Sequence, residues 1–453
     1  MDLTRVLEQC RISPAPAPAS VAQPFSLPLT FFDILWLRSG PVKTLFLYPF
    51  PHTTATFKDS YLPNLKSSLS LTLRHFRPLA GRLRLSPDPC HHYELHCAEG
   101  DSVPLAVAET DIDFLDLVGS HARESHKFRS LVPPLPELDA DVGTNGPPLL
   151  AVQATVFPNR GIGIGVTVRH VACDGATFVH FIKSWASSTR SGGRVPLAGD
   201  APSFDRSVIV DPCNLYSEFL QGMSAVPPAP PAAAEEIGAP SDLVRATFTL
   251  RPDHIEGLKA LVVGRKEPSA FNCSTFVVTC AYMWTCIVKS RGYRADTKAY
   301  IGFLVDWRRR LRPPAPDEYF GNCVGFCPAE AKVGDLVQEC GVVVAAETIG
   351  RAIQGLKGGV SECLAGFYKK YLPVRASGCP ILGTAGSPRF KVYDVDFGWG
   401  RPLKVEITSV ENAGAISLSD SREAQGGVEV GVVLPKHEME ALEAHFEDGL
   451  KLC

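Results

Sequence analysis

The alternation of apolar and polar positions predicts a strand, a turn and a helix near the middle of the chain. Residues Gly161–His170 alternate strictly, as in a β-strand, and one face carries Ile162, Ile164, Val166, Val168 and His170. Residues Ala176–Ser187 then change to the helical period, with a single apolar stripe of Phe178, Phe181, Ile182 and Trp185. This change of period places His170 at the carboxyl end of a strand.

The same patterns predict further elements on both sides of this unit. Leu65–Phe76 has a helical pattern, and Ser269–Val288 lacks charge. The second segment holds too many Ser, Thr and Asn side chains for a membrane span, so we interpret it as a buried helix. Strands are expected at Val405–Val410, Ala415–Ser419 and Val428–Leu434, and a last helix at His437–Leu450.

The length and the loop composition predict two domains. A chain of 453 residues exceeds one ordinary domain. Ser191–Ala201 and Val226–Pro240 are rich in Gly, Pro and Ala, which keep neither a helix nor a central strand. We therefore predict an N-terminal domain over residues 1–190, a crossover linker over 191–240 and a C-terminal domain over 241–453, each of α/β class.

Composition and charge narrow the possible classes of protein. Hydrophobic residues make up 45% and charged residues 21%, enough for a globular core without disulfides or metal. The formal net charge of -3 excludes a globally basic nucleic-acid binder. Met1–Pro14 lacks a signal-peptide pattern, and the 14 cysteines contain no C-x-x-C pair. We expect a cytoplasmic monomer with reduced thiols, without nucleic-acid partners or membrane insertion.

Two motifs carry the candidate chemistry. His170 is followed by Asp174-Gly175, and a strand-end histidine before a helix is well placed for catalysis, although a lone strand histidine is more often a satisfied core group. Residues 396–400 read DFGWG, a five-residue match that rarely arises by chance. The cluster of Cys90, His91, His92, His96 and Cys97 fits no common zinc spacing, so no metal site is expected.

Together the two motifs resemble the BAHD family of plant acyl-CoA-dependent acyltransferases. Segments LPLTFFD at 27–33 and FRPLAGRL at 76–83 agree with that family. Segments DWRRRLRPP at 306–314 and YFGNC at 319–323 resemble its anthocyanin and flavonoid glycoside acyltransferase branch. The resemblance implies a chloramphenicol-acetyltransferase-like fold of two α/β domains with mixed sheets and a channel between them. Acyl-CoA would enter from one face as co-substrate, the acceptor from the other, and His170 would lie where they meet.

The implied reaction needs a base and donors for an oxyanion. A thioester is already activated, so no metal, ATP or permanently bound cofactor is expected, and neutral His170 is suited to take the proton of an attacking hydroxyl. Trp399 is a candidate oxyanion donor, as are the hydroxyls of Thr408 and Ser409, whereas Asp396, Gly398 and Gly400 are expected to be structural. The chain reverses after His170, so Asp174 should point beneath the strand rather than toward His170, and a buried carboxylate there needs a partner. The segment DWRRR offers Arg308 and Arg310, and the family resemblance favours Arg308.

Candidate CoA contacts are less sharply defined. Ser387 and Arg389 belong to a loop resembling a CoA-contacting loop of the family, and the alternative is a plain turn with a solvated arginine. Ser274 and Thr275 are expected to open the apolar helix, where free N–H groups favour a phosphate, although ordinary capping is the first interpretation. Lys259 is a further candidate for the CoA phosphates.

The resemblance implies O-acylation of a sugar hydroxyl on a flavonoid, anthocyanin or other phenolic glycoside. The donor stays open between malonyl-CoA, slightly favoured by the branch, and hydroxycinnamoyl-CoA. Malonyl would need a cation in the acyl pocket, and Arg169 points away from His170 by strand parity. Alternatives are N-acylation of an amine and a catalytically idle ligand-binding relative.

Overall fold

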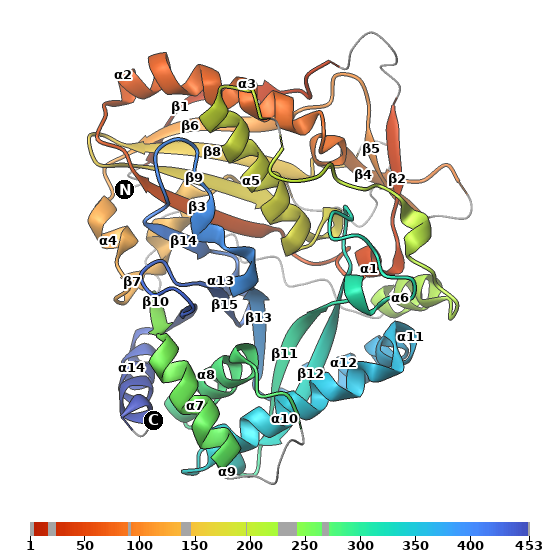
Figure 1. Cartoon of the computed structure of the whole chain (residues 1–453), viewed down its shortest axis with the longest axis vertical. Coiled ribbons are helices and arrows are strands. Elements are labelled where there is room, and N and C mark those ends of the chain that lie inside the picture. The colour runs from red at the N-terminus through yellow and green to blue at the C-terminus, as the bar shows by residue number, and fades with distance from the viewer. Residues whose placement is uncertain are drawn as a thin grey trace.

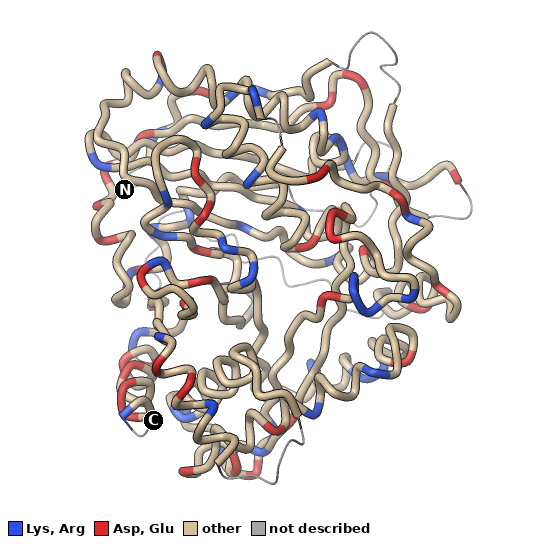
Figure 2. Tube along the Cα trace, viewed as in Figure 1, with Lys and Arg blue, Asp and Glu red and all other residues tan. Residues whose placement is uncertain are grey.

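Two large β-sheets lie one beyond the other along the long axis of the molecule, and helices cover their outer faces (Figure 1). The computed structural model describes residues 4–16, 24–88, 92–136, 146–195, 197–224, 242–264 and 271–451. Lysines and arginines are interspersed with acidic residues along the trace (Figure 2). No helix in these ranges combines the length and apolar character that a membrane crossing requires.

The first sheet has six strands and carries the predicted strand of His170 near its middle. In spatial order they are β1 (Thr4–Ile12), β6 (Val103–Thr110), β8 (Leu150–Phe157), β9 (Gly161–Val168), β3 (Val42–Pro49) and β14 (Lys404–Ile407). Strand β9 pairs antiparallel with both β8 and β3, and all its residues are buried. Burial on both faces explains the run of Gly, Ile and Val in this strand.

The second sheet has seven strands, and its middle is partly parallel. In spatial order they are β12 (Val324–Lys332), β11 (Lys298–Asp306), β13 (Ile381–Gly386), β15 (Ala415–Asp420), β16 (Val428–Pro435), β10 (Leu243–Leu250) and β7 (Arg123–Glu124). A small sheet packs beside the first one and contains β2 (Phe25–Pro28), β5 (Tyr93–Cys97) and β4 (Arg82–Leu85).

Each large sheet borrows a strand from the other half of the chain. Strand β14 pairs with β3 of the first sheet, and β7 pairs with β10 of the second. The two halves are therefore joined by backbone hydrogen bonds as well as by side chains. The domain limits at residues 190 and 240 stay a prediction, and residues 196 and 225–240 of the expected linker lie outside the described ranges.

Helices complete the two layers. In the first half, α3 and α5 pack together, and the Trp185 indole donates to Leu65 O at 3.2 Å. In the second half, α8 contacts α7, α10 and α14, and its side chains from Val277 to Val288 are buried. The helices are α1 (Phe31–Ile34), α2 (Thr54–Thr56), α3 (Leu62–Leu73), α4 (Phe114–Val118), α5 (Gly175–Ser191), α6 (Leu215–Ser224), α7 (Pro252–Gly264), α8 (Thr275–Arg291), α9 (Val333–Leu336), α10 (Gly341–Gly355), α11 (Val360–Leu364), α12 (Phe367–Ala376), α13 (Val410–Ala413) and α14 (Lys436–Leu450).

Most predicted elements are confirmed, although several of their ends differ by a few residues, and two of these differences lie near the candidate site. Strand β14 stops at Ile407, and after one more hydrogen bond to β3, from Thr408 N to Lys43 O, the short helix α13 begins at Val410. The expected strand over 405–410 is therefore wrong in its last part. His170 lies just beyond β9, in the 3-10 turn His170–Ala172, rather than in the strand itself.

Candidate active site

His170 lies in a tight turn between β9 and α5. Pairing of β9 ends at Val168, and Ala172 N then donates to Arg169 O at 2.9 Å. Asp174 caps helix α5, since its carboxylate accepts a hydrogen bond from Thr177 N at 3.1 Å. The turn thus joins a buried strand to a capped helix, which holds the His170 backbone in a defined position.

The His170 imidazole is enclosed. Its ring stacks on the Trp36 indole with a centroid distance of 3.8 Å and an interplanar angle of 11°. Burial lowers the pKa of His170 below its ordinary value, and the opposing contributions of Asp174 and Asp33 are smaller. The imidazole is therefore neutral at pH 7, as a general base must be.

The predicted Asp174–Arg308 ion pair is confirmed. The guanidinium donates two hydrogen bonds to the carboxylate, Nη1 to Oδ2 at 2.7 Å and Nη2 to Oδ1 at 3.1 Å. Both side chains are buried. Burial alone would raise the pKa of Asp174, but Arg308 and the N–H groups of Thr177 and Cys323 outweigh it and hold that pKa below its ordinary value. The carboxylate is bound to the other half of the chain and not to the His170 ring.

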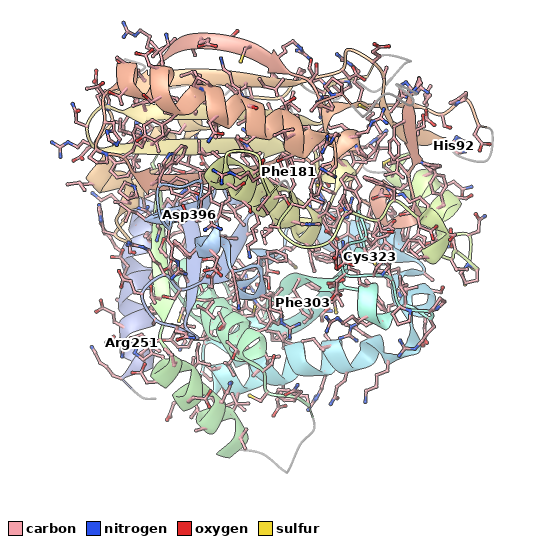
Figure 3. The ribbon with its side chains drawn as sticks, turned by 45° about the horizontal axis from the view of Figure 1, so that its top comes forward. His92, Phe181, Arg251, Phe303, Cys323 and Asp396 are labelled. Atoms are coloured by element: carbon pink, nitrogen blue, oxygen red, sulfur yellow. The ribbon has the colours of Figure 1, made fainter. Side chains whose placement is uncertain are left out.

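The segment YFGNC closes the site from the second half, and Cys323 lies where the two halves meet (Figure 3). Cys323 N donates to Asp174 Oδ2 at 3.0 Å, and the preceding Asn322 N donates to Asp33 Oδ1 at 2.9 Å. The Asn322 amide also donates from Nδ2 to His170 O at 2.9 Å. Two buried carboxylates of the first half thus hold this loop of the second half against the His170 turn.

The DFGWG segment forms a turn at the other end of α5. Asp396 Oδ1 accepts from Gly398 N at 2.7 Å and from Gly400 N at 2.9 Å. Gly398 and Gly400 have φ values of +98° and +87°, which L side chains rarely adopt. Asp396 also pairs with Arg190 at 3.4 Å. The segment therefore has a visible structural role, as expected for Asp396 and the two glycines.

Trp399 is not brought to His170. Its ring packs edge-on against Tyr48 and Phe50 at 5.6 and 5.7 Å. Tyr48 lies opposite Ile162, whereas His170 follows Val168 at the far end of the same strand. With a rise of about 3.3 Å per residue, the ring lies about 20 Å or more from His170. The expectation that Trp399 donates to the oxyanion is wrong for this geometry. Thr408 and Ser409 lie nearer to His170 than Trp399 does. They follow β14, which is two strands away from β9, at the same end of the strands as His170.

The loop with Ser387 and Arg389 lies beside the first turns of α5. The Phe390 ring comes so close to Gly175 that a Cβ there would meet it at 2.7 Å, and Lys183 Nζ donates to Phe390 O at 2.8 Å. Ser387 Oγ accepts from Arg389 N at 3.3 Å, and the Arg389 side chain is exposed. These two residues are therefore on the same side of the molecule as the His170 turn.

The other candidate CoA contacts lie on two different helices, α8 and α7. Ser274 caps α8, and its Oγ accepts from Val277 N at 3.3 Å, so the ordinary capping role is confirmed. Thr275 is the next residue, in the first turn of α8. Phe276 then packs on Phe303 of β11, the strand that leads to Arg308. Lys259, on α7, instead pairs with Glu256 at 2.8 Å, and nothing links it to the His170 turn among the described contacts.

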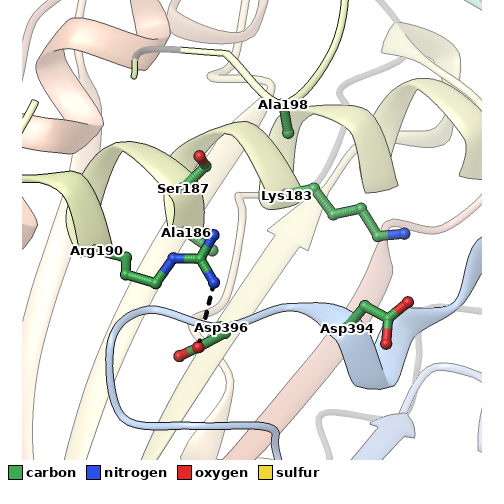
Figure 4. A pocket seen from close by; sticks show the side chains of 7 residues that line it. All are labelled: Lys183, Ala186, Ser187, Arg190, Ala198, Asp394 and Asp396. Atoms are coloured by element: carbon green, nitrogen blue, oxygen red, sulfur yellow. Dashed lines mark hydrogen bonds and ion pairs between the residues drawn. The ribbon is translucent and has the colours of Figure 1, made fainter. Parts of the chain in front are cut away.

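A shallow cleft lies between α5 and the segment that carries Asp394 and Asp396 (Figure 4). It is lined by Lys183, Ala186, Ser187, Arg190, Ala198, Asp394 and Asp396. The two basic side chains, Lys183 and Arg190, come from α5, the two acidic ones come from the facing segment, and the Arg190–Asp396 pair closes one end. Lys183 lies about 13 Å along the helix from Asp174, so the cleft does not open directly onto His170.

No group of three or more His, Cys, Asp or Glu side chains in the described ranges has the geometry of a metal site. Of the cluster considered in the sequence, Cys90 and His91 lie outside those ranges. His92 N donates to Tyr216 OH at 3.1 Å, and His96 Nδ1 is bonded to Ser26 Oγ at 2.8 Å.

Three residues around His170 were not singled out from the sequence: Trp36, Asp33 and Asn322. Asp33 and Asn322 occur in the segments LPLTFFD and YFGNC, which were noted only as family segments. Asp33 and Asn322 could have been identified because each is a polar side chain in an apolar stretch. Asp33 follows two phenylalanines, and Asn322 stands between Gly and Cys.

Comparison with known proteins decides the family. The sequence profile of the Transferase family matches residues 8–449, nearly the entire chain. The chain belongs to the BAHD acyltransferase family. A malonyl-coenzyme A:anthocyanin 3-O-glucoside-6''-O-malonyltransferase of Dahlia pinnata is 40% identical, covering 98% of this chain and 97% of that protein. A coumaroyl-CoA:anthocyanidin 3-O-glucoside-6''-O-coumaroyltransferase of Arabidopsis thaliana is 35% identical, with coverage of 98% and 97%.

The fold is also that of this family. The crystal structure of vinorine synthase matches with a TM-score of 0.68 at 22% sequence identity, covering 98% of each chain. The expected architecture of two α/β halves with mixed sheets is thereby confirmed.

Proposed function

We propose that this protein is an acyl-CoA-dependent O-acyltransferase that acylates a sugar hydroxyl of an anthocyanin or another phenolic glycoside. The observation that carries the proposal is the neutral, enclosed His170 at the junction of the two halves, in a chain of the BAHD family. The relatives named above act on anthocyanin glucosides, which supports the acceptor class.

The reaction follows from ordinary acid–base chemistry at His170. The unprotonated imidazole nitrogen takes the proton of the sugar hydroxyl while its oxygen attacks the thioester carbonyl carbon. The tetrahedral intermediate then breaks its C–S bond, and the CoA thiolate takes the proton from the imidazolium. The products are the acylated glycoside and free CoA, and the reaction requires neither an oxidant nor a metal.

Asp174 supports the base from below. Its pair with Arg308 fixes the start of α5 and so the turn that carries His170. Our candidates for contact with CoA lie beside the carboxyl ends of β13 and β11. They are Ser387 and Arg389, and Ser274 and Thr275 at the amino end of α8. Lys259 is the weakest candidate, since it already pairs with Glu256.

Malonyl-CoA is the donor that we favour. Several relatives at 34–40% identity are named as malonyltransferases, whereas two at 35% are named as coumaroyltransferases. A malonyl carboxylate needs a cation in the acyl pocket beside His170. Cytoplasmic location and a monomeric state remain predictions.

A panel of acyl-CoA donors against anthocyanin and phenolic glucosides, with free CoA measured, tests this function. We expect His170→Ala to lower kcat/KM by about 10²–10⁴-fold while the circular dichroism spectrum is retained. Turnover with p-coumaroyl-CoA alone would move the donor to the aromatic class. Near-normal turnover of folded His170→Ala would refute the base.

A further inference from the structure

Two buried polar atoms beside the base have no hydrogen-bond partner: His170 Nδ1 and Asn322 Oδ1. Unsatisfied buried polar groups cost about 1–3 kcal/mol each, so a native site rarely leaves two of them side by side without a reason. The two residues are already linked, because Asn322 Nδ2 donates to the backbone oxygen of His170 at 2.9 Å.

The orientation of the Asn322 amide is determined by its surroundings. Nδ2 faces three acceptors: Asp33 Oδ1 at 3.0 Å, His170 O at 2.9 Å and Val171 O at 3.4 Å. Carbonyl and carboxylate oxygens accept but do not donate, so a flipped amide would place Oδ1 against all three of them. Oδ1 must therefore point in the remaining direction as a free acceptor.

Asp33 holds this orientation from the first half of the chain. Its carboxylate accepts hydrogen bonds from Thr30 N, Thr30 Oγ1, Asn322 N and Asn322 Nδ2, at 2.8–3.0 Å. Arg206 Nη2 lies 3.7 Å from Asp33 Oδ2. Since four donors already face this carboxylate, it acts as an acceptor toward Asn322.

The His170 ring has little freedom to seek another partner. Its plane is fixed by the stack on Trp36 at 3.8 Å. Burial is the largest influence on its pKa and lowers it, but its own backbone carbonyl and the Asn322 side chain both oppose that effect, as acceptors facing a ring N–H do. The charged groups that act on it are Asp174, the cap of α5, and Asp33 on α1.

We propose that Asn322 is a positioning residue for the base: its Oδ1 accepts a hydrogen bond from His170 Nδ1–H. The proton of neutral His170 then lies on Nδ1, and the lone pair of Nε2 is left for the substrate hydroxyl. The tautomer of a histidine is set by the bond that its other nitrogen makes. This inference rests on the proposed role of His170 as base. It adds that a residue of the other half of the chain fixes the tautomer of the base.

Nitrogen NMR of the whole enzyme tests the tautomer directly. With 15N-labelled histidine, the His170 signals are identified by their loss in His170→Gln. Above the titration of the ring, we expect a protonated nitrogen at Nδ1 and an unprotonated one at Nε2. A proton on Nε2 would overturn the proposal. This result does not depend on turnover, so it is distinguishable from the failure of His170 as base, which the activity of His170→Ala reports.

Asn322→Leu tests the consequence for catalysis. It removes the acceptor at similar volume, and we expect kcat to fall about 10–100-fold with the KM for acyl-CoA unchanged, and the His170 spectrum to lose its single tautomer. The matched control is Thr30→Val, which removes one hydrogen bond to the same Asp33 carboxylate but leaves Asn322 in place. Equal losses of kcat in both variants, with the wild-type tautomer retained in Asn322→Leu, would contradict the proposal. If Asn322→Leu does not fold, the wild-type spectrum still tests the tautomer, since a proton on Nε2 would overturn the proposal.

Discussion

Buried ion pairs join the two halves of the chain in two regions, and only one of them touches the active site. At the His170 turn, Asp174 pairs with Arg308. At the junction of the two large sheets, Glu406 of β14 pairs with Arg123 at 3.0 Å and Arg245 at 3.4 Å. All five side chains are at most 2% exposed.

The two regions differ in what their carboxylates hold in place. Asp174 also binds Thr177 N and Cys323 N, and thereby fixes two loops beside the base. Glu406 binds side chains of regular strands, and none of its described hydrogen bonds reaches residues 170–174. Burial by itself raises the pKa of Glu406, but Arg123 and Arg245 together lower it below its ordinary value. Similar electrostatics therefore stabilise the His170 turn in one region and a sheet junction in the other.

Asp174→Ala should have the largest combined effect. It leaves the buried Arg308 guanidinium with only the exposed Asp306 carboxylate, at 3.4 Å, and breaking a buried pair typically costs about 3–5 kcal/mol of unfolding free energy. The loosened turn should also lower kcat/KM about 10²-fold, because small displacements of a base are costly. Denaturant unfolding and CoA release measure the two effects.

The control for this variant is the double change Asp174→Ala/Arg308→Met. Replacing a buried pair by apolar side chains often restores stability, so we expect recovery of the unfolding free energy without recovery of kcat/KM. Full recovery of both would show that Asp174 acts only through stability.

Glu406→Ala should separate the regions. Two guanidiniums lose their partner, and we expect a loss of about 3–5 kcal/mol of unfolding free energy. The kcat/KM of the folded fraction should stay within about twofold of the wild type, since the described contacts of Glu406 avoid the His170 turn. Glu406→Gln, which keeps the shape and one acceptor oxygen, is the matched control. A tenfold fall in kcat/KM at full folding would place this cluster in the catalytic machinery.

Acid pH should inactivate the enzyme before it unfolds. Because burial lowers the pKa of His170, kcat/KM should stay on its plateau at pH 7 and fall about tenfold per pH unit only below the folded-state pKa, which lies under the ordinary value near 6.5. The lowered pKa values of Asp174 and Glu406 mean that their stabilisation persists down to about pH 4 and is lost as the pH falls further.

The unfolding free energy should also decrease slightly below pH 6.5, since the unfolded chain binds a proton that buried His170 resists. Between these limits the inactivation should reverse on return to pH 7. Loss of activity that coincides with loss of the near-ultraviolet circular dichroism signal would contradict this order.

The sequence predicted the local parts of the site better than its long-range parts. The change of period after His170 located the turn, and chain reversal predicted that Asp174 points away from the His170 ring, because both follow from residues close in sequence. Arg308, 134 residues away, was chosen as the partner of Asp174 on the family resemblance. Trp36 and Asn322 approach His170 from positions 134 residues before and 152 residues after it, and no periodicity reports such contacts. The exchange of β14 and β7 between the sheets was missed for the same reason, since the pattern that predicted a strand near β14 does not report which sheet the strand joins.

The exposed pair between Arg190 and Asp396 should show the smallest effect and so calibrate the buried ones. It links α5 to the DFGWG turn at 3.4 Å, but the Arg190 side chain is 59% exposed. Water and salt screen such a pair, so Arg190→Gln should change the unfolding free energy by only about 0–1 kcal/mol and leave kcat/KM unaltered. The turn itself is held by the bonds from Gly398 N and Gly400 N to Asp396, which do not need the arginine. Unfolding curves at low and high salt measure the difference. A loss comparable to that of Asp174→Ala would mean that exposure does not separate the two kinds of pair, and that the DFGWG turn depends on α5 for its shape.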